Sequence, residues 1–148
     1  MSNDINKNNA KADYGIFLIA IPIVSTMMIW LWVSGMSLLQ RPGDTMSLIM
    51  LATVLGTAII AAVEASKLGM VGDRKKGTYG PVAWFFLITL LWVVCYPVYL
   101  FKRRHYGLKN LVIPGLISAL MFIISWSIMG SAIDAQIAEV QQQIETIR

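Results

Sequence analysis

Residues 77–101 read GTYGPVAWFFLITLLWVVCYPVYLF and contain no Asp, Glu, Lys or Arg. Three further charge-free runs cover residues 14–36, 45–63 and 111–133, so all 20 charged residues lie in the remaining 58 positions. A soluble helix needs a polar face, and these runs lack one. At about 1.5 Å per residue each run is roughly 28–38 Å long, enough to cross a hydrocarbon core of about 30 Å.

We therefore predict an all-α polytopic membrane protein with four transmembrane helices and a C-terminal amphipathic or coiled-coil helix. The apolar share of 57% and the mean hydropathy of +0.66 exclude a secreted disulfide domain and a disordered chain. The expected organisation is a polar tail over 1–13, a transmembrane domain over 14–133, and a heptad helix over 134–148 that continues span four. The four expected spans are residues 14–36, 45–65, 80–101 and 111–133.

The formal net charge of +4 does not indicate a nucleic-acid partner. The basic residues flank the apolar runs instead of lining a helical face, which is typical of contact with lipid headgroups. We expect membrane lipids as partners and no nucleic acid. The residues expected to contact lipid or a partner protein are Glu64, Arg74, Lys75, Arg103 and Arg104.

Small residues recur at four-residue spacing in the second run. Such spacing lets two helices approach closely in lipid, although alanine is also common in spans for no particular reason. We expect a packing face for a neighbouring helix, formed by Ala58, Ala61, Ala62 and Ala65.

The C-terminal segment spaces its apolar residues by four and three in alternation. Ile137 and Ile144 fall at one core position of a heptad and Val140 at the other, and β-branched residues at both favour three or four strands. The segment holds only about two heptads, so the alternative is an amphipathic helix that lies on the bilayer or on the protein's own loops. We expect self-association through Ile137, Val140 and Ile144.

The basic residues leave the orientation open. With the N-terminus inside, seven Lys and Arg lie inside and five outside, a weak bias. The loops 66–79 and 102–110 are both basic and flank the same span. If that span crosses the membrane once, the two loops lie on opposite sides, and one basic loop must be external. Cytoplasmic N- and C-termini with a basic external loop are the first expectation. The others are a span three that bends at Pro97 and returns, leaving the C-terminus outside, and dual insertion.

The inventory of reactive side chains predicts neither an enzyme nor a metal or cofactor site. His105 is the only histidine and Cys95 the only cysteine, so a metal or haem site lacks ligands within one chain. The spans contain no acid and base for catalysis. Glu64, the one acid near membrane depth, is expected to form an interfacial pair with Lys67, three residues on.

Part of the chain resembles a known group. An acidic-Ala-Ser turn, Glu64-Ala65-Ser66, precedes a Trp-rich span that ends in Pro97-Val98-Tyr99-Leu100 and then Lys102-Arg103. This pattern, over about residues 60–107, resembles a two-span segment of uncharacterised small bacterial inner-membrane proteins. Asp is more usual there at the place of Glu64, and the heptad tail is not part of the pattern. The resemblance implies a bacterial inner membrane, an anchoring role for Glu64, and no catalytic residue.

These features together predict a small non-catalytic inner-membrane scaffold or interaction subunit that forms a homo-oligomer or binds a membrane-protein partner. The alternative is a small channel, exporter subunit or phage-type pore former, with Ser125, Ser127 and Ser131 lining a passage between several copies. No charge in the middle of a span is available to bind an ion or to couple transport to a gradient, which counts against that alternative.

Overall fold

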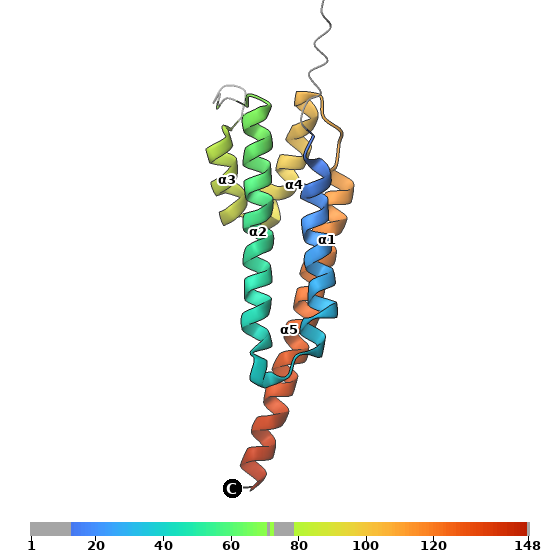
Figure 1. The fold of residues 1–148 in the computed structure, drawn as a ribbon, viewed down its shortest axis with the longest axis vertical. Helices are drawn as coiled ribbons and strands as arrows, with labels where there is room; N and C mark the ends of the chain where they lie inside the picture. Colours follow the sequence, from blue (N-terminus) through green and yellow to red (C-terminus); the bar gives the residue numbers. More distant parts are fainter. Residues whose placement is uncertain (1–12, 71, 73–78, 148) are drawn as a thin grey trace, which may run out of the picture.

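The computed structural model describes residues 13–70, 72 and 79–147, and this part of the chain is all-helical, without strands. Its longer helices are α1 (Gly15–Leu31), α2 (Pro42–Lys67), α3 (Pro81–Leu90), α4 (Trp92–Lys102) and α5 (Val112–Ile147) (Figure 1). Short 3-10 turns are η1 (Val33–Gly35), η2 (Leu38–Gln40) and η3 (Arg103–Tyr106). The predicted helical class is confirmed.

Three helical segments, not four, are long and apolar enough to cross a membrane within the described ranges. They are Gly15–Gly35, Pro42–Lys67 and Val112–Ile147, with 21, 26 and 36 residues. Helix α2 begins at Pro42, three residues before the expected span, because proline suits the first helical position, where its missing N–H would be unpaired anyway. The prediction of four spans is wrong.

The third apolar run breaks into two short antiparallel helices. Leu91, between α3 and α4, has φ −129° and ψ 47°, outside the helical region. The break lies six residues before Pro97, where a bend was expected, and Pro97 stands inside α4. Helices α3 and α4 thus form a hairpin beside one half of α2, and both its ends lie at the same end of the bundle (Figure 1).

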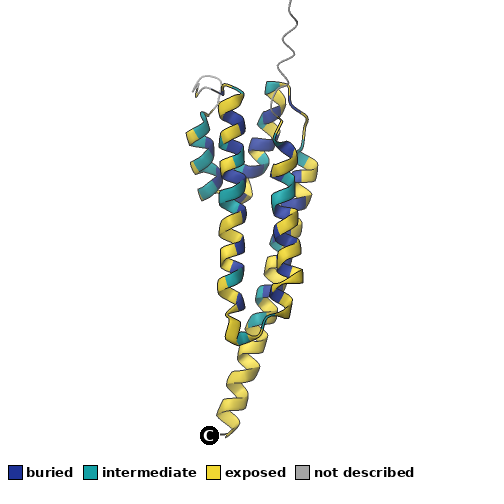
Figure 2. Cartoon of the chain, viewed as in Figure 1, coloured by how far each residue is buried: buried dark blue, intermediate teal, exposed yellow. Residues whose placement is uncertain are grey.

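Polar side chains of α4 hold this hairpin against the long helices. The Trp92 Nε1–H donates to the Thr57 hydroxyl at 2.9 Å, and the Tyr96 hydroxyl donates to the Leu18 carbonyl at 2.9 Å. The Trp92 ring also stacks on Tyr96 and meets Phe122 of α5 edge-on. Buried residues concentrate on these facing surfaces, whereas residues 134–147 of α5 are exposed throughout (Figure 2).

The described chain begins and ends at opposite ends of the bundle (Figure 1). Three crossings and a returning hairpin would place the two termini on opposite sides of a membrane, whereas two cytoplasmic termini need an even number of crossings. The expectation that both termini are cytoplasmic stays a prediction. The second alternative, in which the third run dips in and returns, agrees with this fold, although the turn falls at Leu91.

The hairpin predicts that its two flanking segments are accessible from the same side. Gly72→Cys and Asn110→Cys, each in a Cys95→Ala background, should react with a membrane-impermeant maleimide from the same face of sealed vesicles. Leu39→Cys, in the exposed turn between α1 and α2, should react from the opposite face. Labelling of residues 72 and 110 from opposite faces would show that the third run crosses.

Candidate functional site

An ionic cluster, formed by the buried side chains of Glu64, Tyr99 and Arg103 and by the exposed Asp13, lies where the start of α1 meets the ends of α2 and α4. The Arg103 Nε–H donates to Glu64 Oε2 at 2.8 Å, and Arg103 Nη2 donates to Glu64 Oε1 at 2.6 Å. Both side chains are 0% exposed. This two-pronged pairing matches the planar fork of a guanidinium to a carboxylate.

Two further donors complete the surroundings of the Glu64 carboxylate. The Tyr99 hydroxyl donates to Oε2 at 2.9 Å, and the Tyr14 backbone N–H donates to Oε1 at 3.1 Å. A buried ion pair offsets its desolvation only when its remaining hydrogen-bonding positions are also filled. Glu64 meets that condition, so its charge is held rather than offered to a ligand.

Asp13 adds a second carboxylate to Arg103. Its Oδ1 accepts from Arg103 Nη2 at 2.5 Å and from the Gly15 N–H at 2.9 Å. Partial burial alone would raise the pKa of the Asp13 carboxyl, but these two hydrogen bonds lower it below its ordinary value. The contribution of this contact to stability is therefore present above the pKa of an unfolded Asp and is lost as the pH falls through the lowered value.

Gly15 provides the space for the guanidinium. A Cβ at this position would lie 2.6 Å from Arg103 Nη1 and would overlap the end of the Leu111 side chain. Arg103 Nη1 is buried and has no hydrogen-bond partner among the described residues. The start of α1 is thus shaped around Arg103, and both N–H donors of Nη1 lack a partner among the described residues.

The cluster corrects several sequence-based expectations. The pair between Glu64 and Lys67 is wrong, because Glu64 binds Arg103 while the Lys67 ammonium contacts the Tyr14 hydroxyl and lies 4.9 Å from the centre of the Tyr14 ring. Glu64 and Arg103 do not contact lipid, since both are fully buried. Arg104 is exposed, and Arg74 and Lys75 lie outside the described residues.

Sequence reasoning missed the roles of Asp13 and Tyr99. The sequence places Asp13 in the polar tail over 1–13, and Tyr99 only in the pattern that ends the third run. The available signal was an acid, Glu64, and a base, Arg103, each at the boundary of an apolar run. Only a third run that returns to the same side brings these two boundaries together.

The small-residue face of α2 is used within the chain. Ala58, Ala61 and Ala65 are fully buried and Ala62 is half-buried. The Ala61 carbonyl lies 3.0 Å from the Tyr99 hydroxyl, so this face packs against the α3–α4 hairpin. It is therefore covered and not available to a second copy.

The serines of α5 do not face one passage in a single chain. Ser125 is buried and accepts from the Trp30 Nε1–H of α1 at 3.0 Å, whereas Ser127 and Ser131 are exposed. Within the described residues, no group of three His, Cys, Asp or Glu side chains is placed to hold a metal ion.

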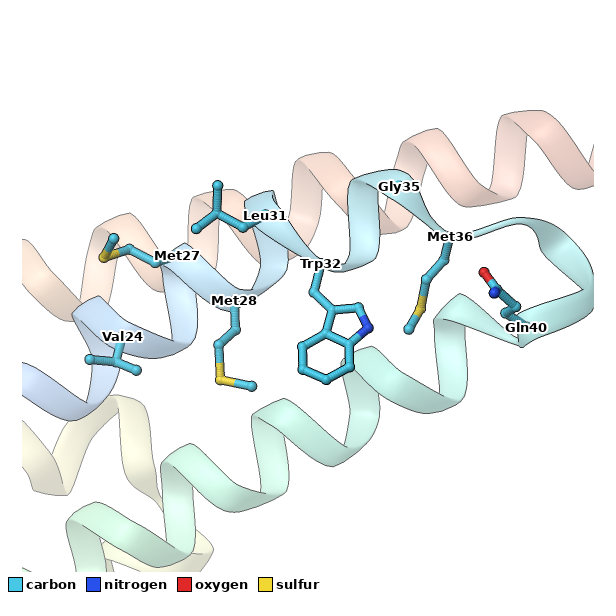
Figure 3. A pocket seen from close by; sticks show the side chains of 8 residues that line it. All are labelled: Val24, Met27, Met28, Leu31, Trp32, Gly35, Met36 and Gln40. Atoms are coloured by element: carbon cyan, nitrogen blue, oxygen red, sulfur yellow. The ribbon is translucent and has the colours of Figure 1, made fainter.

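An apolar groove runs along the other half of α1. It has a volume of about 770 Å³. Met28 of α1, and Trp32 and Met36 in the segment that follows it, point towards α2 along the groove (Figure 3). Its lining consists of Val24, Met27, Met28, Leu31, Trp32, Gly35, Met36 and Gln40. The lining carries no charged residue and is mostly apolar.

The described residues form an all-α bundle of three helices long and apolar enough to cross a membrane and a half-length hairpin, joined by the buried pair of Glu64 and Arg103. Comparisons with protein-family models, with curated protein sequences and with solved structures find no match to this chain.

We expect removal of one partner of the buried pair to be costly. Glu64→Gln should lower the free energy of unfolding by about 3–5 kcal/mol, because it leaves the buried Arg103 charge with only the partly exposed Asp13 carboxylate as an ionic partner. Glu64→Leu combined with Arg103→Leu should lose less than either single change. The measurement is unfolding in mixed detergent micelles.

Asp44→Asn, in the exposed pair with Arg41, is the control and should have no measurable effect. A double variant as unstable as the sum of the two single ones would contradict this account.

A matched pair of glycine substitutions tests the fit around Arg103. Gly15→Ala should destabilise the protein by about 1–3 kcal/mol, because the added methyl group has no room. Gly130→Ala in α5 should be neutral or stabilise by up to about 1 kcal/mol, since its surroundings are open and alanine favours helix. Equal effects in the same unfolding assay would mean that the contact around Gly15 is not tight.

Proposed function

We propose that this chain is a non-catalytic scaffold or interaction subunit of a bacterial inner membrane, and that it self-associates through the C-terminal part of α5. The observation that carries the proposal is a helix that continues beyond its own bundle with an exposed apolar seam. Residues 134–147 are all exposed and extend for about 21 Å. No other described helix packs on this segment (Figure 1).

The seam has the composition of an association surface. Ile137, Val140 and Ile144 are 41%, 42% and 61% exposed. In the heptad that these residues define, the positions flanking the core include Gln136, Gln141 and Gln143, which are uncharged. Copies of this helix could therefore approach without like-charge repulsion, and the proposed occupant of the seam is a second copy of the chain.

The ionic cluster supports a structural role for the bundle. A catalytic acid or base must reach its substrate, but Glu64 and Arg103 are fully buried and bind each other. The cluster joins the start of α1 to the ends of α2 and α4 and so stabilises a rigid base for the projecting helix.

The distribution of basic residues supports an orientation. Three crossings and a returning hairpin assign the N-terminal segment and both loops flanking the hairpin to one side by connectivity. These segments carry ten of the 12 Lys and Arg, leaving Arg41 and Arg148 for the other side. The positive-inside rule then favours a cytoplasmic N-terminus and an external C-terminal helix. The excess of Lys and Arg on the cytoplasmic side is therefore larger for three crossings than for four spans.

Cysteine cross-linking tests the proposed association. In a Cys95→Ala background, Ile144→Cys should form disulfide-linked dimers on oxidation in native membranes. Gln142→Cys, at the heptad position farthest from the core, should form far fewer. Light scattering of the purified protein should give three or four copies. A monomer in mild detergent, or equal cross-linking at residues 142 and 144, would contradict self-association.

A further inference from the structure

The two halves of the bundle differ in the number of helices that pass through them. Near the ionic cluster, all five described α-helices are present, whereas only α1, α2 and α5 continue into the other half (Figure 1). Helices α3 and α4 contain 10 and 11 residues, each about 15–16 Å long. That length is about half of a 30 Å hydrocarbon core.

One hydrogen bond fixes the depth of the hairpin tip. Trp92, the first residue of α4, donates to Thr57 of α2. Thr57 lies ten residues before Lys67, about 15 Å along the helix, and α2 continues for another fifteen residues, about 22 Å, to Pro42. The hairpin therefore ends near the bilayer midplane and occupies one leaflet only.

The extra cross-section in that leaflet is large. A helix about 10 Å across has a cross-section of roughly 80 Å², so two helices add roughly 160 Å². The hairpin cannot yield easily, because the hydrogen bonds of Trp92, Tyr96 and Tyr99 and the buried pair of Arg103 tie it to the long helices. Close-packed protein interiors have low compressibility.

We propose that the chain acts as a wedge that binds preferentially to curved bilayers, with the hairpin half in the convex leaflet. The convex leaflet of a strongly curved bilayer has the larger area, so a protein that is wider in that leaflet lowers the cost of bending. A flat bilayer must instead deform around the same shape. The inference rests on the membrane location included in the proposed function, but not on self-association or on which side is cytoplasmic.

Two matched variants change the shape at exposed, lipid-facing positions. Ala52→Phe with Ser127→Phe adds volume to the half that lacks the hairpin, because residue 52 lies about 22 Å from the Lys67 end of α2 and residue 127 about 22 Å from the start of α5. Val63→Phe with Val82→Phe adds volume to the hairpin half. The first pair should weaken the wedge, and the second should preserve it.

The experiment measures protein density on phosphatidylcholine vesicles of mixed diameter. The full chain, labelled with a dye at Gly72→Cys in the Cys95→Ala background, is reconstituted, and its fluorescence per unit of lipid dye is recorded vesicle by vesicle. We expect density to be about two- to threefold higher on the smallest vesicles than on the largest. An impermeant quencher should reach most of the dye on the smallest vesicles. The Ala52→Phe, Ser127→Phe variant should lose much of this dependence, and the Val63→Phe, Val82→Phe variant should keep it.

Two results would overturn the wedge. One is a protein density independent of vesicle diameter, and the other is a hairpin side that faces the interior of small vesicles. Protein that does not float with the vesicles would overturn the membrane location itself, and with it the proposed function, so the two failures are distinguishable.

Discussion

A buried charge must be paired, and in this chain Arg103 is paired with Glu64. The segment between these two residues must therefore return to the level at which it began. The two residues are 39 positions apart, at the end of α4 and near the end of α2. Their side chains bind with no exposure to solvent. Separating them across a bilayer would leave each charge at the edge of an apolar span without its partner, which costs several kcal/mol. The third apolar run turns back at Leu91, and this turn brings the two charges together.

The hairpin that results explains the arrangement of the other helices. Its aromatic residues make the contacts that hold it in place. Trp92 forms a hydrogen bond with α2 and Tyr96 with α1, while Trp84 of α3 meets Tyr99 of α4 edge-on. The small residues Ala58, Ala61 and Ala65 give α2 a flat face on which the hairpin packs. Because the hairpin ends at mid-depth, the other half keeps only three helices, and α1 presents its apolar groove there.

The same constraint links the fold to the proposed role. In the proposed arrangement, an odd number of crossings would place the last turns of α5 on the side opposite to the start of α1, and these turns are exposed. A rigid, internally paired base and a projecting helix with an exposed seam are the parts that a scaffold needs. The half-length hairpin gives that base its unequal width.

The sequence by itself determined the helical class and the positions of the three long apolar helices to within a few residues, because charge-free runs of about 20 residues have few other stable states. It also placed the buried alanines on one face, since helical periodicity is a local property. The break at Leu91 could not be predicted from the sequence, because neither Gly nor Pro occurs there. Pro97 favours a bend six residues later, but it lies inside α4. Only the tertiary structure decided the turn, since the partners that fix it, Thr57, Leu18 and Glu64, lie 35 to 78 residues away from Trp92, Tyr96 and Arg103.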